Sequence, residues 1–444
     1  MPRAVSGPWS RWVRDWADVI RASFLIGAVV LAVLGHGGGA LRLFLTFLVA
    51  LVPRLIGCAW PFDLVFGAAM SLQAWGNVSR VFYTWLGYHD IVHFLLTGAT
   101  AILVYFLLVF LRLVPDLSED THARQRAGIA TLTFAIGTVV NAIYECYEWF
   151  VDHELHGHLL ENYHHTMFDL FFGGLGSVAA GLAMAVWATR KWAFRREEAE
   201  GPLAGLRGRI ERRADRSVAG GSPRAVRRLL RNPGWGRGAV ALSDLARISL
   251  VVGFALAAAA GNSDQMVRFG VSLLVSLLAR RLAAPGPFEL CFNGGLLFEA
   301  WGAYATAYHG LPGYDAWANF ALSLGSTPIV YLALIRWGVF PEFGREARVH
   351  RRVALFVAAM CLGFCCGIYY EEYVWLANHY LGANMPTSWT GVIRRLALDW
   401  AGSCAGAVAL ILWDFCGLGS VRREAVSRAG VDGIRPGRAS TIRV

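Results

Sequence analysis

The stretch Tyr144–Trp149 reads Tyr-Glu-Cys-Tyr-Glu-Trp and places two carboxylates, Glu145 and Glu148, inside a long apolar run. An ionised carboxylate is costly in such surroundings unless it is paired with a cation or bound to a metal. A similar stretch, Tyr370–Trp375, follows 226 residues later (370 − 144) and reads Tyr-Glu-Glu-Tyr-Val-Trp. Both tyrosines, the first glutamate and the tryptophan therefore recur, which indicates an internal repeat.

Residues on the N-terminal side of the stretch match at the same offset without a gap. The matched pairs include Asp18 and Asp244, Arg21 and Arg247, Pro61 and Pro287, Trp75 and Trp301, Tyr88 and Tyr314, and Pro115 and Pro341. Chance does not keep such a register, so the pattern predicts a tandem duplication. Further along, we expect a four-residue insertion in the second half, which would match Asp169 with Asp399.

The composition favours a membrane protein. The chain has 444 residues, of which 56% are hydrophobic and 16% charged, whereas soluble domains carry about 25% charged residues. The formal net charge is +10, but the basic residues gather in loops and tails, and no interleaving with aromatic residues suggests base stacking. We therefore expect no nucleic-acid partner. The eight cysteines include no CxxC pair and are interpreted as small buried hydrophobes.

Each half holds about six apolar runs, and a helix of about 20 residues is enough to cross the hydrocarbon core. The runs lie at 17–35, 41–58, 62–80, 89–111, 128–150 and 166–188, and again at 243–260, 267–284, 288–305, 315–337, 353–376 and 396–415. The fold class predicted is all-α, a polytopic transmembrane protein of two parallel six-helix repeats with about 12 membrane helices. The third run of each repeat is the weakest and either spans the bilayer or re-enters it.

The distribution of arginine predicts the topology. Basic residues precede the first run and fill alternate loops, whereas the loop 152–166 has no Lys or Arg. By the positive-inside rule, we expect both termini to be cytoplasmic. The predicted domains are a first repeat at 1–189, a basic cytoplasmic linker at 190–238, a second repeat at 239–416 and a basic disordered tail at 417–444. The linker either only fixes topology or also docks to anionic lipid headgroups.

This topology brings acids and imidazoles to one level near the outer face. His89 and His93 open the fourth run, Glu145 and Glu148 close the fifth, and Asp169 opens the sixth. Two histidines four residues apart share one helical face. With a carboxylate from a neighbouring helix they can bind a divalent metal and leave a position open for water. We predict metal ligands at His89, His93 and Asp169, with Zn, Mn or Mg as the possible ion.

The candidates for catalytic groups are Glu145, Glu148 and Glu371. A glutamate that is not a metal ligand can act as a general base on a bound water. The second half has Asp315 and Asn319 at the positions of the two histidines. We therefore expect one competent site, in the first half, while the second half is structural or shapes a shared cavity.

Structural interpretations of the same residues remain open. Glu145 and Glu371 are also consistent with buried acids that accept hydrogen bonds from tyrosine and tryptophan. Asp169 and Asp399 are also consistent with acids that stabilise the first turn of a helix. The histidines of the loop 152–166 are also consistent with an exposed loop that has no further task.

The segment Tyr88–Phe94, the stretch Tyr144–Trp149 and Asp169 together resemble the YjdF-like family of uncharacterised bacterial inner-membrane proteins. The resemblance covers the fourth to sixth predicted helices of each half. It departs from the family pattern at His89, where the family has an aspartate. The resemblance implies a membrane domain without an assigned reaction.

Three functions are consistent with these patterns. One is a transporter or permease in which Glu145 and Glu371 carry protons or cations. Another is a metal-assisted hydrolase or transferase that acts on a lipid-linked substrate at the outer leaflet. The third is a scaffold whose basic linker recruits partners. Membrane lipids are the expected partners in each case, together with a small-molecule or lipid-linked substrate in the first two.

Overall fold

A computed structural model of the chain describes residues 16–85, 87–111, 113–114, 122–154, 163–190, 233–305, 310–311, 313–340, 349–380, 388–416, 418 and 420. The regular elements of this part are helices, which confirms the all-α class. The chain divides into two compact units, Met1–Val218 with Arg348–Ala354, and Ala219–Ala347 with Leu355–Val444. Most of the predicted linker (191–232) and of the predicted tail (421–444) lies outside the described residues.

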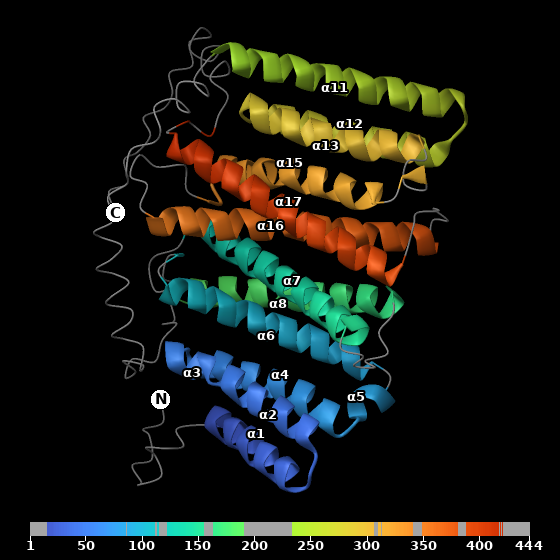
Figure 1. The fold of residues 1–444 in the computed structure, drawn as a ribbon. Helices are drawn as coiled ribbons and strands as arrows, with labels where there is room; N and C mark the ends of the chain where they lie inside the picture. The colour runs from blue at the N-terminus through green and yellow to red at the C-terminus, as the bar shows by residue number, and fades with distance from the viewer. Residues whose placement is uncertain are drawn as a thin grey trace. The chain divides into compact units, whose positions relative to one another are not determined.

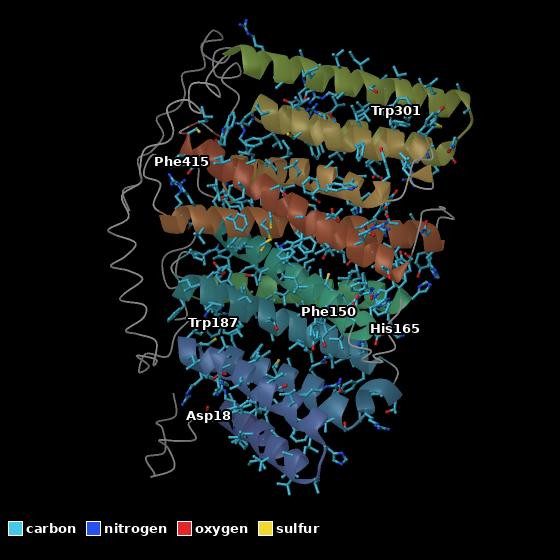
Figure 2. The ribbon with its side chains drawn as sticks, viewed as in Figure 1. Asp18, Phe150, His165, Trp187, Trp301 and Phe415 are labelled. Carbon is cyan, nitrogen blue, oxygen red and sulfur yellow. The ribbon has the colours of Figure 1, made fainter. Side chains whose placement is uncertain are left out.

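The first unit is a bundle in which helices that are close in sequence pack side by side (Figure 1). Its helices are α1 (Trp16–Val33), α2 (Gly37–Ala50), α3 (Val52–Ile56), α4 (Trp60–Val78), α5 (Val81–Thr84), α6 (Tyr88–Phe110), α7 (Ala123–Glu154) and α8 (Tyr163–Thr189). Helix α1 packs on α2 and α4, α4 on α6, and both α6 and α7 on α8. Asp18 and Trp187 lie at one end of this bundle, and Phe150 and His165 at the opposite end (Figure 2).

The second unit has the same order of neighbours. Its described helices are α11 (Pro233–Ala259), α12 (Ser263–Arg281), α13 (Gly286–Tyr304), α15 (Tyr314–Arg336), α16 (Val349–Tyr380) and α17 (Trp389–Phe415). Helix α11 packs on α12 and α13, α13 on α15, and α15 on α17. These pairs correspond to α1 with α2 and α4, α4 with α6, and α6 with α8.

Nine helical segments of the described chain are long and apolar enough to cross a bilayer. They are α1, the joined α2 and α3, α6, α7, α8, α11, α15, α16 and α17. Helices α4 and α13, which correspond to the weak third run of each half, are not among them, and neither is α12, which carries four charged residues (Asp264, Arg268, Arg280 and Arg281). The chain is a polytopic membrane protein.

The starts of the last three helices of each unit differ by 226 residues. Helices α6, α7 and α8 begin at 88, 123 and 163, and α15, α16 and α17 begin at 314, 349 and 389. Backbone contacts keep the same register, because Gly176 lies against the carbonyl of Phe94 as Gly402 lies against the carbonyl of Phe320. The offset is therefore unchanged up to the end of α8 and α17.

This register shows that the predicted four-residue insertion is wrong. The residue that corresponds to Asp169 is Arg395 (169 + 226), and Asp399 corresponds to Gly173. The predicted insertion matches Asp169 with Asp399 because both are aspartates. The helices instead keep their register through the close packing of small residues, and the charged side chains differ between the units.

Helix α7 is longer than the apolar run that predicted it. The run ends at residue 150, whereas the helix continues to Glu154. His153 stacks on Trp149 one turn earlier, with ring centroids 4.7 Å apart, and this contact supports the added turn. The predicted loop 152–166 is correspondingly shorter, and its residues 155–162 lie outside the described part of the chain.

A buried arginine joins the first helices of the first unit. Arg21 on α1 donates through Nε to the carbonyl of Ala50 on α2 (2.7 Å). Its other nitrogens donate to Asp18 (2.6 Å) and to the buried carboxylate of Asp63 on α4. Three helices are thus linked through one guanidinium. Arg247 makes the corresponding contacts in the second unit.

Helices α6 and α8 approach each other backbone to backbone. A Cβ atom on Gly98 would lie 2.8 Å from the carbonyl oxygen of Gly176, and a Cβ on Gly176 would clash with the carbonyl of Phe94. No side chain larger than hydrogen fits at either position without moving a helix. This close approach places the residues of α6 that include His93 opposite Asp169 on α8.

We expect Asp63→Leu to destabilise the protein by about 3 kcal/mol, because it leaves the buried Arg21 guanidinium without its main carboxylate partner. Thermal unfolding of detergent-purified protein measures the loss. The double variant Arg21→Met with Asp63→Leu removes both charges and should recover most of the stability. A single variant as stable as the double variant would contradict this account of the network.

Gly176→Ala should destabilise the protein by about 1–3 kcal/mol, because the added methyl group forces α6 and α8 apart. The matched control is Gly294→Ala on α13, where a Cβ atom meets nothing within 4 Å. That substitution should be neutral or should stabilise the helix by up to about 1 kcal/mol. Equal shifts in the unfolding temperature of both variants would show that the close approach does not limit packing.

Candidate functional site

The first unit gathers the predicted site residues at one end of three helices. His89 and His93 lie in the first two turns of α6, and Asp169 lies in the second turn of α8. Glu145 and Glu148 lie near the end of α7. The first turns of α6 and α8 lie at the same end of the bundle as the last turns of α7. These side chains therefore lie at one level of the bundle.

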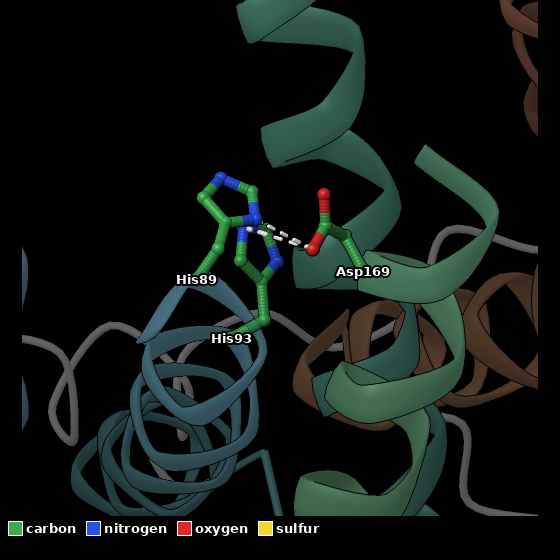
Figure 3. A group of neighbouring side chains, drawn as sticks. All are labelled: His89, His93 and Asp169. Atoms are coloured by element: carbon green, nitrogen blue, oxygen red, sulfur yellow. Dashed lines mark hydrogen bonds and ion pairs between the residues drawn. The ribbon is translucent and has the colours of Figure 1, made fainter. Parts of the chain in front are cut away.

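His89, His93 and Asp169 form a group with the spacing of metal ligands (Figure 3). His89 Nδ1 donates a hydrogen bond to Asp169 Oδ1 (2.7 Å), and His93 Nε2 lies 3.9 Å from the same oxygen. Bonds of about 2.05 Å to a tetrahedral ion would place such atoms about 3.3 Å apart. These two separations lie on either side of that value, so small side-chain movements would allow the three residues to bind one ion.

Two polar atoms of this group are buried and form no hydrogen bond with the described residues. His93 is 3% exposed and Asp169 is 0% exposed. Within the described residues, His93 Nε2 and Asp169 Oδ2 have no hydrogen-bond partner. Leaving a buried polar atom unsatisfied costs about 1–3 kcal/mol. An ion or a water molecule would remove this cost, and both atoms belong to the same group of ligands.

Asn141 fixes the orientation of the His93 ring. Its Nδ2 donates to the backbone carbonyl of Asp169 (2.8 Å), and its Oδ1 accepts a hydrogen bond from the Thr97 hydroxyl (3.0 Å). The same oxygen lies 3.2 Å from His93 Nδ1. Because an amide oxygen only accepts, His93 Nδ1 carries the proton and Nε2 has the free lone pair. This is the tautomer that a metal ion binds, held by a neighbouring acceptor.

Glu145 lies on the Nδ1 side of the His93 ring, and Glu148 lies close to the same imidazole. Glu145 Oε1 is 3.5 Å from His93 Nδ1, and both carboxylates approach this imidazole closely enough to form a second group of possible ligands. The Tyr144 hydroxyl accepts a hydrogen bond from Gln73 Nε2 (2.6 Å) and contacts Glu148. The two glutamates are therefore positioned to exchange protons beside the His89–His93–Asp169 group.

The cluster is rich in acids, and the helical segments around it contain no basic residue that would balance their charge. Asp169, Glu145 and Glu148 are all buried. The segments that carry the cluster, 88–110, 127–154 and 163–189, contain no Lys or Arg. Buried carboxylates must be protonated or neutralised by a cation. The arrangement therefore favours the binding of a divalent cation or of protons.

The third predicted catalytic residue, Glu371, lies in a separate cluster in the second unit. Arg395 donates to both of its carboxylate oxygens, at 2.7 and 2.8 Å. Asn319 Nδ2 donates to the same carboxylate at 2.7 Å. Both oxygens of this carboxylate are thus already engaged by protein donors. The contacts of Glu371 therefore favour a structural role over proton abstraction.

Two residues of these clusters were not predicted from the sequence. Asn141 is an amide within an apolar run, four residues before Glu145 and so on the same helical face, and this spacing is the signal that would have identified it. Arg395 lies immediately before the predicted start of the last run at residue 396. Because the expected insertion matches Asp169 with Asp399, it leaves Arg395 without a counterpart in the first half.

Residues 21–190 of the chain are similar to a family described as a predicted membrane protein family (DUF2238). The matched segment runs from within α1 to the end of α8, so it includes the whole cluster of the first unit. The matched segment is longer than the resemblance noted above, which covers only the fourth to sixth predicted helices. No curated protein and no solved structure matches the chain. The similarity supports an uncharacterised membrane family and assigns no activity.

Proposed function

We propose that the first unit binds a divalent metal ion through His89, His93 and Asp169. The observation that carries this proposal is that His93 Nε2 and Asp169 Oδ2 are buried in one ligand group without a hydrogen-bond partner among the described residues. Two imidazoles and a carboxylate suit zinc or manganese better than magnesium, which prefers oxygen ligands. Three protein ligands also leave a coordination position for water.

The activity that this site supports best is metal-assisted hydrolysis or group transfer on a lipid-linked substrate. A divalent ion there would lower the pKa of a bound water. Glu148 would take the proton of the attacking water and return it to the leaving oxygen of the substrate, whereas Glu145 lies on the Nδ1 side of His93, away from the Nε2 atom that would bind the ion. Glu371 is left out of this set, because Arg395 already occupies its carboxylate.

The depth of the site favours a reaction at the membrane surface. His93 is five residues from the start of α6 and Asp169 six residues from the start of α8, or about 8–9 Å along each helix. The hydrocarbon core is about 30 Å thick, and transporters bind their cargo near its midplane. A site close to the helix ends is instead within reach of a lipid headgroup.

Transport is the second candidate. Acids buried in membrane helices often mark the path of protons or cations, and Glu145 is such an acid, at 1% exposure. A transporter or permease would use it as a proton or cation site. Measurements of flux and of hydrolysis on the same variants separate the two functions.

We further propose that the two units are parallel copies of one six-helix repeat, with about 12 membrane helices in total. The constant offset of helices and contacts supports this proposal. The distribution of arginine supports cytoplasmic termini, and the resemblance to bacterial inner-membrane proteins supports a location in that membrane. Membrane lipids are then the immediate partners of the chain.

Detergent-purified protein incubated with Zn²⁺ or Mn²⁺ and passed over a desalting column should retain about one ion per chain. His93→Ala should lower the affinity at least tenfold, because it removes a ligand from a three-residue site. His36→Ala, at an exposed position after α1, is the matched control and should retain the ion. A wild-type protein that retains neither metal would contradict the proposed site.

Glu148→Gln should reduce headgroup release from vesicles of phosphatidylethanolamine and phosphatidylglycerol about 10²- to 10⁴-fold while the bound metal is retained, because the variant lacks a proton acceptor. Glu154→Gln, exposed at the end of α7, should leave release unchanged. Loss of Zn²⁺ uptake into proteoliposomes in Glu145→Gln, with no headgroup release by the wild type, would favour transport instead.

A further inference from the structure

The second unit contains a counterpart of the metal-ligand cluster, built from different residues. The close contacts at Gly176 and Gly402 fix the correspondence between the two units. At the offset of 226, His89 corresponds to Asp315, His93 to Asn319, Glu145 to Glu371, Glu148 to Val374 and Asp169 to Arg395. The basic residue thus stands where the first unit has its central carboxylate.

The Arg395 guanidinium spans the counterpart cluster. Its Nε and Nη2 donate to the two carboxylate oxygens of Glu371, and Nη1 lies 3.3 Å from Asp315 Oδ2. One planar cation therefore connects the positions that correspond to Glu145 and His89. Arg394, which is half exposed, adds a second contact to Asp315 at 2.8 Å.

The remaining polar groups of the second cluster are also joined by hydrogen bonds. Asn319 Nδ2 donates to Glu371 (2.7 Å) and approaches Asp399 (3.4 Å), and Ser323 donates to Asp399 (2.6 Å). The acids of this cluster thus accept hydrogen bonds from fixed protein donors. In the first unit the acids Glu145 and Asp169 instead lie beside imidazoles, which can bind a metal ion.

In each cluster a polar side chain packs against a glycine of the neighbouring helix. The helix that supplies the polar side chain differs between the two units. In the first unit, Asn141 of α7 fills the space beside Gly173 of α8. In the second unit, Asp399 of α17 fills the space beside Gly367 of α16. Each glycine stands where the other unit has the polar residue, so the two units exchange the glycine and the polar residue between the paired helices.

We propose that Arg395 takes the place of the metal ion in the second unit, so that this cluster binds no metal and the chain holds one ion. The inference rests on the metal site proposed for the first unit. A guanidinium neutralises Glu371 and Asp315 permanently. An incoming divalent ion would meet this fixed positive charge in place of the Asp169 carboxylate, and the ion-paired Asp315 and the amide of Asn319 in place of two imidazoles. The second cluster is then an ion-paired support whose stability does not depend on metal supply.

The test converts the second cluster into the first. The triple variant Asp315→His, Asn319→His and Arg395→Asp should retain two Zn²⁺ ions per full-length chain, whereas the wild type retains one. The matched control carries Asp315→His and Asn319→His with Arg395 unchanged, and it should retain one. Zinc per chain is measured by mass spectrometry after desalting, on protein that elutes as a single species and has wild-type helix content.

Two ions on the wild-type chain, or one ion on a folded triple variant, would overturn the proposal. If the triple variant does not fold, the reverse exchange decides: His89→Asp, His93→Asn and Asp169→Arg should retain no zinc and should unfold at the same temperature with and without EDTA. Failure of that variant to fold, or an EDTA-dependent unfolding temperature, also overturns the proposal. A wild-type chain without any ion instead contradicts the first-unit metal site, so the two failures differ.

Discussion

Carboxylates buried in a bundle of apolar helices must be protonated or paired with a cation, and this constraint determines which polar residues surround them. In three places the protein uses its own arginine: Arg21 against Asp63, Arg247 against Glu289, and Arg395 against Glu371. The cluster around Asp169 differs from these three, because the helical segments 88–110, 127–154 and 163–189 that carry it contain acids and imidazoles but no Lys or Arg. The need to neutralise buried acids therefore distinguishes the clusters that contain their own arginine from the cluster that would bind a ligand.

Neutralisation alone would not build a site, since the ligands must also be brought within bonding distance. The backbone contact of α6 with α8 at Gly98 and Gly176 does this in the first unit. His93 and Asp169 each lie on the facing sides of those helices, and Asn141 of α7 holds both through its two amide atoms. The small residues set the distance, and the amide sets the tautomer.

The sequence predicted the apolar helices well, because the thickness of the bilayer fixes how long an apolar segment must be. It also predicted His89, His93 and Asp169 as neighbours, because the alternating direction of successive spans returns their ends to one level. It failed for Arg395, because similar residues were matched in place of similar packing positions. The spacing of four residues from Glu145 places Asn141 on the same helical face, but the partners of its hydrogen bonds depend on how the neighbouring helices are rotated, which spacing within one helix does not reveal.

The two clusters also show why their residues must differ as complete sets. Placing arginine at the position of Asp169 while His89 and His93 remain would set a guanidinium against two imidazoles that have lost their carboxylate. Placing aspartate at position 395 would leave Glu371 and the new acid without their cation, and would leave Asp315 with only the half-exposed Arg394. Breaking a buried ion pair on one side costs about 3–5 kcal/mol, so intermediates between the two sets are unstable. One fold thus accommodates either a metal-ligand set or a guanidinium set at this position, and the acids Glu145 and Glu371, common to both, are the part that each set must neutralise.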